Sequence, residues 1–300
     1  QDEGTIVVAP GDPLIIGVAT IRSGEGLVPL GDDILRGVEL AIDARPVVTV
    51  GDVEFPLELD VQDDQCSQVG GQAVANYYVT LPEVVGVVGP TCSSACRAAG
   101  PIFDGANYTM ISSSCTAPDL TDAETGFASF NRTTPNDAAQ GAEAAGFIFN
   151  TLGLTKIATL HDGSPYGEGL VKKLTEAFVE LGGEVVFADS ITVGETNYRT
   201  ALTPIAESGA ELIYFGGFPQ EAARLIEQRL DVNLGELPFM GADGINTPEL
   251  INLAGELAEG VYASSPVATE SEALAEFIAA YEEKYEAEPT AASYADGDYV

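Results

Sequence analysis

The chain has 300 residues, of which 45% are hydrophobic, so it can bury a sizeable core and does not have the composition of a disordered protein. Its 47 acidic and 12 basic residues give a net charge of −35, which disfavours binding to nucleic acid or directly to an anionic membrane surface. No apolar run approaches the roughly 18 residues that would span a bilayer. We interpret the acidic excess as a source of solubility, compatible with high salt, which screens the repulsion between charges.

Strands and helices alternate along the first part of the chain, and the total length favours two lobes over one. Residues 14–20 form a buried apolar strand. Apolar residues recur at helical spacing from Ile34 to Ile42 and predict a helix that Asp32 or Asp33 caps. The next elements are a strand, a helix, a strand, a short helix and a strand, at residues 55–61, 73–78, 84–88, 97–103 and 108–111.

A polar segment at residues 131–137 predicts a hinge, and the alternation starts again beyond it. Helices and strands then alternate at residues 138–151, 157–160, 167–181, 184–187, 198–208, 211–215, 219–230 and 238–240. Residues 261–266 form a second crossing between lobes, and helices at residues 272–285 and from Thr290 onward return to the first lobe. This order predicts an α/β fold with parallel sheets flanked by helices and with ligands at the carboxyl ends of the strands.

Two hydroxyl-rich loops each follow a predicted strand. Gly89 to Ser94 come after residues 84–88, and Ser112 to Thr116 come after residues 108–111. Hydroxyls and free backbone N–H groups between a strand end and a helix start bind anions such as a carboxylate. The two loops therefore predict a small-molecule site. The alternative is that Ser93 and Ser94 cap a helix and Thr116 shapes a turn.

The four cysteines are Cys66, Cys92, Cys96 and Cys115, and all lie next to predicted strand ends. An even number in such loops fits two disulfides and an oxidising compartment. We favour Cys66–Cys92, which would tie two adjacent strand-end loops, and Cys96–Cys115, which would join the hydroxyl-rich loops. Four free buried thiols in a cytosolic protein are the alternative. No Cys-x-x-Cys pair is present and His161 is the single histidine, so no metal site is predicted.

Several motifs keep the order and spacing of a known family. They are Gly31-Asp32, Asp63 to Cys66, Gly89 to Ser94, Met110 to Pro118, His161-Asp162 with Tyr166 to Gly169, Tyr214 to Phe218, and Phe239 to Gly244. From about residue 13 onward the chain resembles the type I periplasmic solute-binding proteins of branched-chain amino acid ABC transporters, of the leucine/isoleucine/valine-binding type. Typical members continue for some tens of residues past the equivalent of Val300, so we expect this sequence to lack the last crossing and the terminal strands of the family.

The resemblance implies two Rossmann-like lobes, residues 1–133 plus 265–300 and residues 134–264, which close on a ligand in the cleft between them. It further implies that Ser93, the backbone of Ser114 and Thr116 bind the carboxylate of an amino acid. Asp243 stands where relatives carry an acidic residue, usually Glu, and would bind the ammonium group together with the carbonyl of Thr91.

The same resemblance implies a side-chain pocket formed by Leu30, Cys92, Tyr166 and Phe218, with Tyr166 stacked over the ligand. Leu30 and Phe218 make this pocket apolar, which favours an aliphatic or aromatic amino acid. Without the resemblance, ordinary core packing is the simpler interpretation of Leu30 and Phe218, and Tyr166 could lie on a helix face.

The implied function is that of a non-catalytic binding protein without a cofactor. It would be a monomer in the periplasm or outside the cell, with or without a membrane anchor, and it would deliver an amino acid to an ABC-transporter permease. Which amino acid it binds stays open. A sensor domain, or a binding protein for a small amide, urea or an aromatic carboxylate, is the alternative within this fold. An enzyme is the competing class, but the chain has no Gly-x-Ser-x-Gly, Gly-x-Gly-x-x-Gly or P-loop motif.

Overall fold

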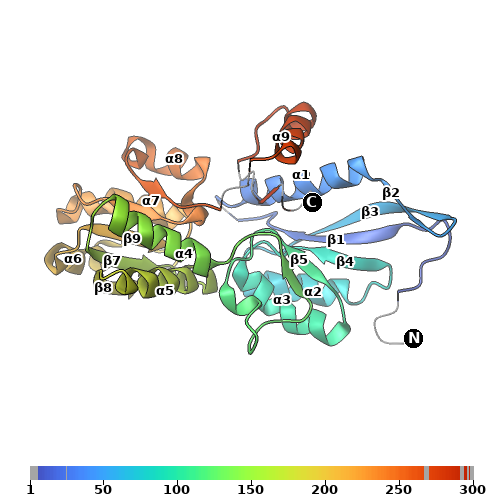
Figure 1. Ribbon diagram of the computed structural model, residues 1–300, viewed down its shortest axis with the longest axis horizontal. Coiled ribbons are helices and arrows are strands. Elements are labelled where there is room, and N and C mark those ends of the chain that lie inside the picture. The colour runs from blue at the N-terminus through green and yellow to red at the C-terminus, as the bar shows by residue number, and fades with distance from the viewer. Residues whose placement is uncertain (1–5, 25, 267–269, 291–293, 296, 298–300) are drawn as a thin grey trace. The chain divides into compact units, whose positions relative to one another are not determined.

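The computed structural model describes residues 6–24, 26–266, 270–290, 294, 295 and 297 (Figure 1). The chain divides into two compact units. Unit 1 consists of Gln1–Thr134 and Val267–Val300, and unit 2 consists of Pro135–Pro266. The helix that the sequence predicts from Thr290 onward lies mostly outside the described residues. None of the helices in the described part of the chain is both long and apolar enough to cross a membrane.

Unit 1 is built on a six-stranded sheet with the strand order β2-β3-β1-β4-β5-β6. Its strands are β1 (Leu14–Thr20), β2 (Val47–Val50), β3 (Val53–Asp63), β4 (Val84–Val88), β5 (Met110–Ser112) and β6 (Phe130–Arg132). Strands β3, β1, β4, β5 and β6 pair in parallel, so the carboxyl ends of all five lie at one edge of the sheet.

Strand β2 departs from the parallel arrangement that the sequence predicted, because it pairs antiparallel with β3. Only Gly51 and Asp52 separate the two strands, and a two-residue connection can join antiparallel neighbours but not parallel ones. Gly51 has a φ of 64°, a conformation that glycine adopts readily in such hairpin turns. The sheet of unit 1 is therefore mixed, with five parallel strands and the antiparallel strand β2 at its edge.

Four helices cover the sheet of unit 1: α1 (Val28–Ala44), α2 (Gln68–Tyr78), α3 (Ser93–Ala106) and α9 (Glu272–Tyr285). Figure 1 shows α1 on one face of the sheet and α2 with α3 on the other. The core under α2 and α3 includes Tyr78, Phe103 and Met110, all fully buried. Helix α9 packs on α1 through Phe277 and Tyr281.

The predicted capping of the first helix by Asp32 or Asp33 is wrong. Helix α1 begins at Val28 with Leu27 at its N-cap, and Pro29 occupies the first turn, where a missing N–H costs nothing. Asp33 instead lies buried within the helix. Its carboxylate accepts hydrogen bonds from the hydroxyl of Tyr281 and, at 2.7 Å, from the backbone N–H of Thr290. Asp33 thus holds the segment around Thr290 against α1.

Unit 2 has a five-stranded sheet in which every pairing is parallel, in the order β11-β10-β9-β7-β8. Its strands are β7 (Lys156–His161), β8 (Glu184–Ser190), β9 (Leu212–Gly216), β10 (Phe239–Gly241) and β11 (Tyr262–Ala263). Its helices are α4 (Asp137–Gly146), α5 (Pro165–Glu180), α6 (Arg199–Ser208), α7 (Pro219–Gln228) and α8 (Pro248–Ala254).

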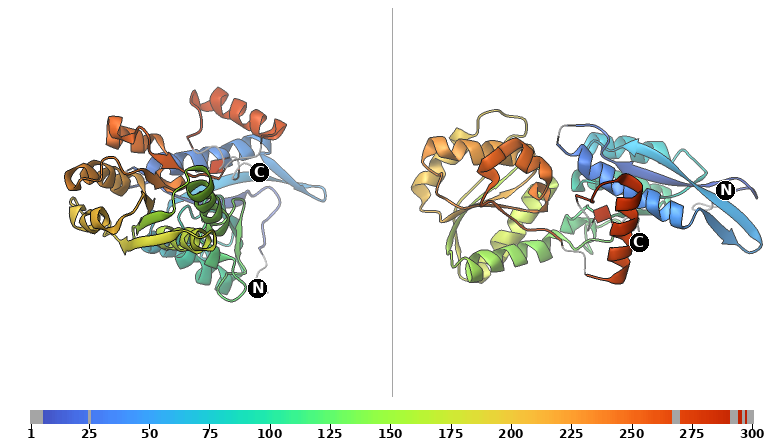
Figure 2. Two further views of the ribbon diagram at one scale, coloured as in Figure 1. Left: turned by 60° about the vertical axis from the view of Figure 1, so that its left-hand side comes forward. Right: turned by 90° about the horizontal axis from the view of Figure 1, so that it is seen from above.

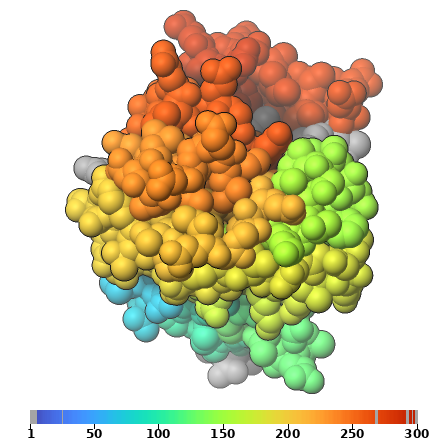
Figure 3. Space-filling model, turned by 90° about the vertical axis from the view of Figure 1, so that its left-hand side faces the viewer, coloured from blue at the N-terminus to red at the C-terminus, as the bar shows by residue number. Residues whose placement is uncertain are grey.

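The helices of unit 2 cover both faces of its sheet (Figure 2). One buried cluster joins α4 and α5 to the sheet through residues such as Leu174 and Tyr214. A second cluster joins α6, α7 and α8 to the opposite face through residues such as Leu202 and Phe215. Figure 3 shows a face of unit 2 on which the yellow and orange segments of the chain lie in front. Both faces of the sheet are thereby closed to solvent, which leaves the strand ends as the place for a site.

Candidate functional site

Asp64 connects the ends of three strands in unit 1. It directly follows β3 and is fully buried. Its carboxylate accepts hydrogen bonds from the backbone N–H groups of Thr91 (2.5 Å) and Cys66 (2.8 Å). Its own N–H donates to the carbonyl of Thr20 at the end of β1, at 3.1 Å. Burial raises the pKa of the Asp64 carboxyl above its ordinary value. Asp64 belongs to a motif of the sequence, but no role was predicted for it.

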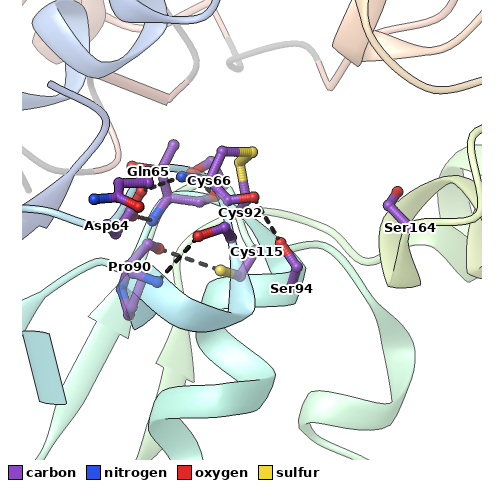
Figure 4. Close-up of a disulfide and its surroundings, with 12 residues drawn as sticks. Asp64, Gln65, Cys66, Pro90, Cys92, Ser94, Cys115 and Ser164 are labelled. Atoms are coloured by element: carbon purple, nitrogen blue, oxygen red, sulfur yellow. Dashed lines mark hydrogen bonds between the residues drawn. A yellow bond between two sulfur atoms is a disulfide. The ribbon is translucent and has the colours of Figure 1, made fainter. Parts of the chain in front are cut away.

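The four cysteines form two disulfides, Cys66–Cys92 and Cys96–Cys115, the pairing favoured from the sequence. The alternative of four free thiols is wrong. The first disulfide joins the loop after β3 to the residue before α3, and the second joins α3 to the loop after β5. Figure 4 shows the first disulfide beside Asp64 and Ser94. Three loops at the carboxyl edge of the sheet are thus covalently linked.

The hydroxyls of Ser93 and Ser94 connect these loops and do not cap a helix. Helix α3 starts at Ser93, and its N-cap, Cys92, makes no side-chain capping hydrogen bond. The Ser93 hydroxyl oxygen accepts a hydrogen bond from the backbone N–H of Ala117, at 3.1 Å. The Ser94 hydroxyl donates to the carbonyl of Cys66, at 2.9 Å (Figure 4). The capping interpretation of Ser93 is therefore wrong.

The second hydroxyl-rich loop contacts the first through Ser114, whose hydroxyl donates to the carbonyl of Thr91 at 2.7 Å. Thr116 follows in the same loop and is 0% exposed. Its Oγ1 has no hydrogen-bond partner among the residues that the structure describes. A buried hydroxyl without a partner destabilises a protein by about 1–3 kcal/mol, so Thr116 Oγ1 is a candidate for bonding a group that is not part of the chain.

Arg132, at the end of β6, holds the same loop through hydrogen bonds to its backbone. Its guanidinium donates hydrogen bonds to the carbonyls of Cys115 (2.9 Å) and Ala117 (3.0 Å) and to the hydroxyl of Thr121. Because these carbonyls are directed to Arg132, the chain between them is fixed with Thr116 at its centre. From the sequence, Arg132 was predicted only to belong to a polar hinge, and this role was not predicted.

Leu30 lies half-buried in the first turn of α1, next to Gly31. A Cβ atom on Gly31 would lie 2.0 Å from the carbonyl oxygen of Ile21, so only glycine allows α1 to approach the end of β1 so closely. The Thr91 hydroxyl is 3.3 Å from that of Thr20, which donates to the carbonyl of Gly31 at 3.0 Å. These hydrogen bonds place the start of α1 beside the hydroxyl-rich loops.

In unit 2, the predicted residues Tyr166, Phe218 and Asp243 lie together. Asp243 follows β10, and its Oδ1 accepts hydrogen bonds from the Tyr166 hydroxyl and from Nε2 of Gln140, each at 2.8 Å. The ring of Tyr166 is buried, and its centroid lies 5.4 Å from that of Phe218. Gln140 was not predicted as a site residue, because a glutamine in an alanine-rich helix does not by itself indicate a binding role.

The candidate residues therefore form two groups. Unit 1 carries the hydroxyl-rich group: Leu30, Thr91, Cys92, Ser93, Ser114 and Thr116. Unit 2 carries the acidic and aromatic group: Tyr166, Phe218 and Asp243. Among the described residues, the structure contains no cluster of three His, Cys, Asp or Glu side chains that could hold a metal ion.

The sequence matches a protein family described as periplasmic binding protein, over residues 13–300. It is similar to the Leu/Ile/Val/Thr-binding protein of Salmonella typhimurium, with 32% identity over 256 residues, which cover 85% of this chain and 68% of that protein. It is also similar to the Leu/Ile/Val-binding protein of Escherichia coli K12, with 32% identity over 253 residues, which cover 84% of this chain and 67% of that protein.

Two solved structures have the same fold. A leucine-binding protein from Thermotoga maritima superposes with a TM-score of 0.86 at 24% identity, covering 95% of this chain and 80% of that chain. A branched-chain amino acid transporter substrate-binding protein from Streptococcus pneumoniae, in complex with isoleucine, superposes with a TM-score of 0.81 at 26% identity. The alignment covers 96% of this chain and 81% of that chain. These similarities confirm the expected α/β fold of the type I periplasmic binding proteins.

Proposed function

The chain belongs to the periplasmic binding protein family, and we propose that it captures an aliphatic or branched-chain amino acid for uptake by an ABC transporter. One observation carries the choice of ligand-binding loop: the hydroxyl of Thr116 is fully buried and has no partner among the described residues, in a loop that Arg132 and a disulfide hold in place. A ligand carboxylate would satisfy this hydroxyl.

The carboxylate of the amino acid binds to the hydroxyl-rich loops of unit 1. Thr116 donates its hydroxyl and backbone N–H, Ser93 contributes its hydroxyl, and Ser114 contributes its backbone. Hydrogen bonds to a charged group contribute about 1.5–3 kcal/mol each, so three or four of them are enough for micromolar affinity, about 8 kcal/mol.

The ammonium group of the ligand binds to Asp243 of unit 2, with the Thr91 carbonyl as a second acceptor. A carboxylate attracts an ammonium group most strongly where both are removed from water. Contacts that form only when the ligand is bound stabilise the liganded state relative to the free protein.

The side chain of the ligand lies against Leu30, Cys92, Tyr166 and Phe218. Apolar and aromatic surfaces here favour an aliphatic side chain over a charged one, because a charge would lose its hydration without a partner. Tyr166 combines two roles: its ring faces the ligand, and its hydroxyl holds Asp243.

The protein acts by binding alone, as a monomer, in the periplasm or outside the cell, and it delivers its ligand to a transporter permease. A hydrolytic role for His161 has no support in its surroundings, since its Nδ1 accepts a hydrogen bond from the backbone N–H of the nearby Gly163, at 3.1 Å. The two disulfides fit an oxidising location.

Calorimetric titration of the protein with the twenty common amino acids tests the proposal. We expect at least one aliphatic amino acid to bind with micromolar or tighter affinity and to raise the melting temperature, as a ligand specific for the native state must. Urea, small amides and benzoate serve as the contrasting probes. Binding of one of these, with no binding of any amino acid, would contradict the proposal.

A further inference from the structure

Gln140 lies at the centre of a buried polar network in unit 2. It belongs to the first turns of α4 and is 7% exposed. Its Nε2 is 2.8 Å from Oδ1 of Asp243, 3.1 Å from the hydroxyl oxygen of Ser264 and 3.3 Å from the carbonyl oxygen of Ser264. The amide group of Gln140 therefore contacts two residues that lie 103 and 124 positions further along the chain.

Chemistry fixes the orientation of this amide. A carboxylate oxygen and a carbonyl oxygen can only accept hydrogen bonds, so the group of Gln140 that faces them must be the NH₂ group. Its Oε1 consequently points elsewhere, and this atom is buried without a hydrogen-bond partner among the described residues. Burying Oε1 without a partner costs free energy. The hydrogen bond from Nε2 to the charged carboxylate of Asp243 offsets that cost.

Asp243 is held by two donors at once. The hydroxyl of Tyr166 and Nε2 of Gln140 both donate to Oδ1, and the Tyr166 hydroxyl itself accepts a hydrogen bond from the backbone N–H of Gly244, at 2.9 Å. A Cβ atom on Gly244 would lie 2.5 Å from the carbonyl oxygen of Gly217, so only glycine permits this packing. Two donors on one oxygen stop the carboxylate from rotating freely about its Cβ–Cγ bond.

Ser264 anchors the other side of the network. It follows β11 and lies two residues before Pro266, where unit 2 ends, while α4 begins just after Pro135, where unit 2 starts. Gln140 thus ties Asp243 to both ends of unit 2. Ser264 is half-buried, so its hydroxyl can be removed with less disturbance than a core side chain.

We propose that Gln140, anchored by Ser264, is a positioning residue that orients Asp243 toward the amine of the ligand and so sets the preference for amino acids over amine-free acids. This inference rests on the proposed function, because it takes Asp243 as the group that binds the ammonium. It assigns to Gln140 no contact with the ligand.

The test compares two ligands that differ only in the amine, L-leucine and 4-methylpentanoate, by calorimetry or by competition. The variant is Gln140→Met, which keeps the unbranched shape. We expect its affinity for L-leucine to fall at least about tenfold, since a hydrogen bond to a charged group is lost. Its affinity for 4-methylpentanoate should stay within about twofold, because the acid makes no use of Asp243.

Gln228→Met is the matched control. Gln228 is a buried glutamine of the same unit, but its amide bonds the backbone of Tyr198 and Thr196, away from Asp243. It should change neither affinity. Ser264→Ala should lower the affinity for L-leucine relative to 4-methylpentanoate, as Gln140→Met does, but by a smaller factor. If Gln140→Met does not fold, Ser264→Ala is the variant that tests the proposal.

If 4-methylpentanoate binds too weakly to measure, a double-mutant cycle tests whether Gln140 acts through Asp243. In an Asp243→Ala background, Gln140→Met should have no further effect on L-leucine affinity. Equal losses for both ligands, unchanged L-leucine affinity, or additive effects in the cycle would overturn the inference and leave the proposed function standing. Failure of the unmodified protein to bind any amino acid would instead refute the proposed function.

Discussion

The candidate residues at the carboxyl ends of the strands differ in chemical type between the two units. In unit 1, several loops supply hydroxyls and backbone N–H groups, and both disulfides lie there. In unit 2, which contains none of the four cysteines, one carboxylate at Asp243 is held by the side chains of Gln140 and Tyr166.

Under the proposed function, the difference matches the chemistry of the two ends of an amino acid. Binding a carboxylate through neutral groups requires several weak donors, and these come from separate loops that must keep fixed relative positions. Cross-links and the buried carboxylate of Asp64 provide that rigidity. Binding an ammonium group requires one well-oriented carboxylate, and hydrogen bonds from two side chains suffice to orient it.

Removing a cross-link is the most direct way to break this comparison. Replacing Cys66 and Cys92 by serine should lower the free energy of unfolding of unit 1 by about 3.5 kcal/mol, the loop-entropy value for a separation of 26 residues. Hydrogen exchange measured by mass spectrometry should show lost protection in unit 1 while peptides of unit 2 stay protected. Equal loss in both units would mean that the disulfide does not act locally.

Asp243→Asn removes the charge from the unit 2 edge while keeping its shape. Affinity for an amino acid should fall by about 2 kcal/mol, roughly 30-fold, because the ammonium loses its counter-charge. Asp231→Asn is the control, since Asp231 pairs with Arg199 on the surface of the same unit. Calorimetry checks both variants, and unchanged affinity in Asp243→Asn would redirect the search to amine-free ligands.

Thr116→Val sharpens the comparison by acting on unit 1 alone. The free protein should be as stable as the unmodified one or more stable, because an unsatisfied buried hydroxyl disappears. Affinity should fall about tenfold for L-leucine and 4-methylpentanoate alike, since both present a carboxylate. Thr159→Val, at another buried hydroxyl without a partner but in β7, is the control and should leave both affinities unchanged.

The smallest effect concerns pH. Burial raises the pKa of Asp64 in the folded protein, so its contribution to stability is fully present below the unfolded pKa and is lost as the pH rises through the folded pKa. Asp64→Asn does not titrate. Denaturant unfolding from pH 3 to 7 should therefore show the stability of the variant, relative to the unmodified protein, increasing with pH. A constant difference would contradict the assigned pKa shift.

Long periodic segments were predictable from the sequence, and so were the short strands β5 and β10, which apolar runs at residues 108–111 and 238–240 indicated. The helix predicted at residues 272–285 is present as α9 with the same bounds. Strand β6 has three residues and α8 has seven, too few for a hydrophobic period to stand out, and both were missed. The error at Asp33 has a different cause: an aspartate near a helix start resembles a cap, but tertiary contacts with Tyr281 and Thr290 bury it.

The candidate site was predictable only where residue type reveals chemistry. Serine and threonine clusters after strands indicated the unit 1 loops, and the resemblance to a known family added Asp243. Gln140 and Arg132 could not be found this way, because their roles depend on which distant backbone and side-chain groups they reach after folding.

The hydrogen bond between Asp33 and Tyr281 spans 248 residues of chain. During synthesis, α1 leaves the ribosome long before α9 exists, so Leu40 and its neighbours have no cover until all of unit 2 has been translated. Unit 2, which is continuous in sequence, can assemble in the meantime. Unit 1 therefore exposes apolar residues of α1 until α9 has been translated. During that interval the nascent chain is prone to aggregation, and a chaperone or a translocation channel would have to protect it.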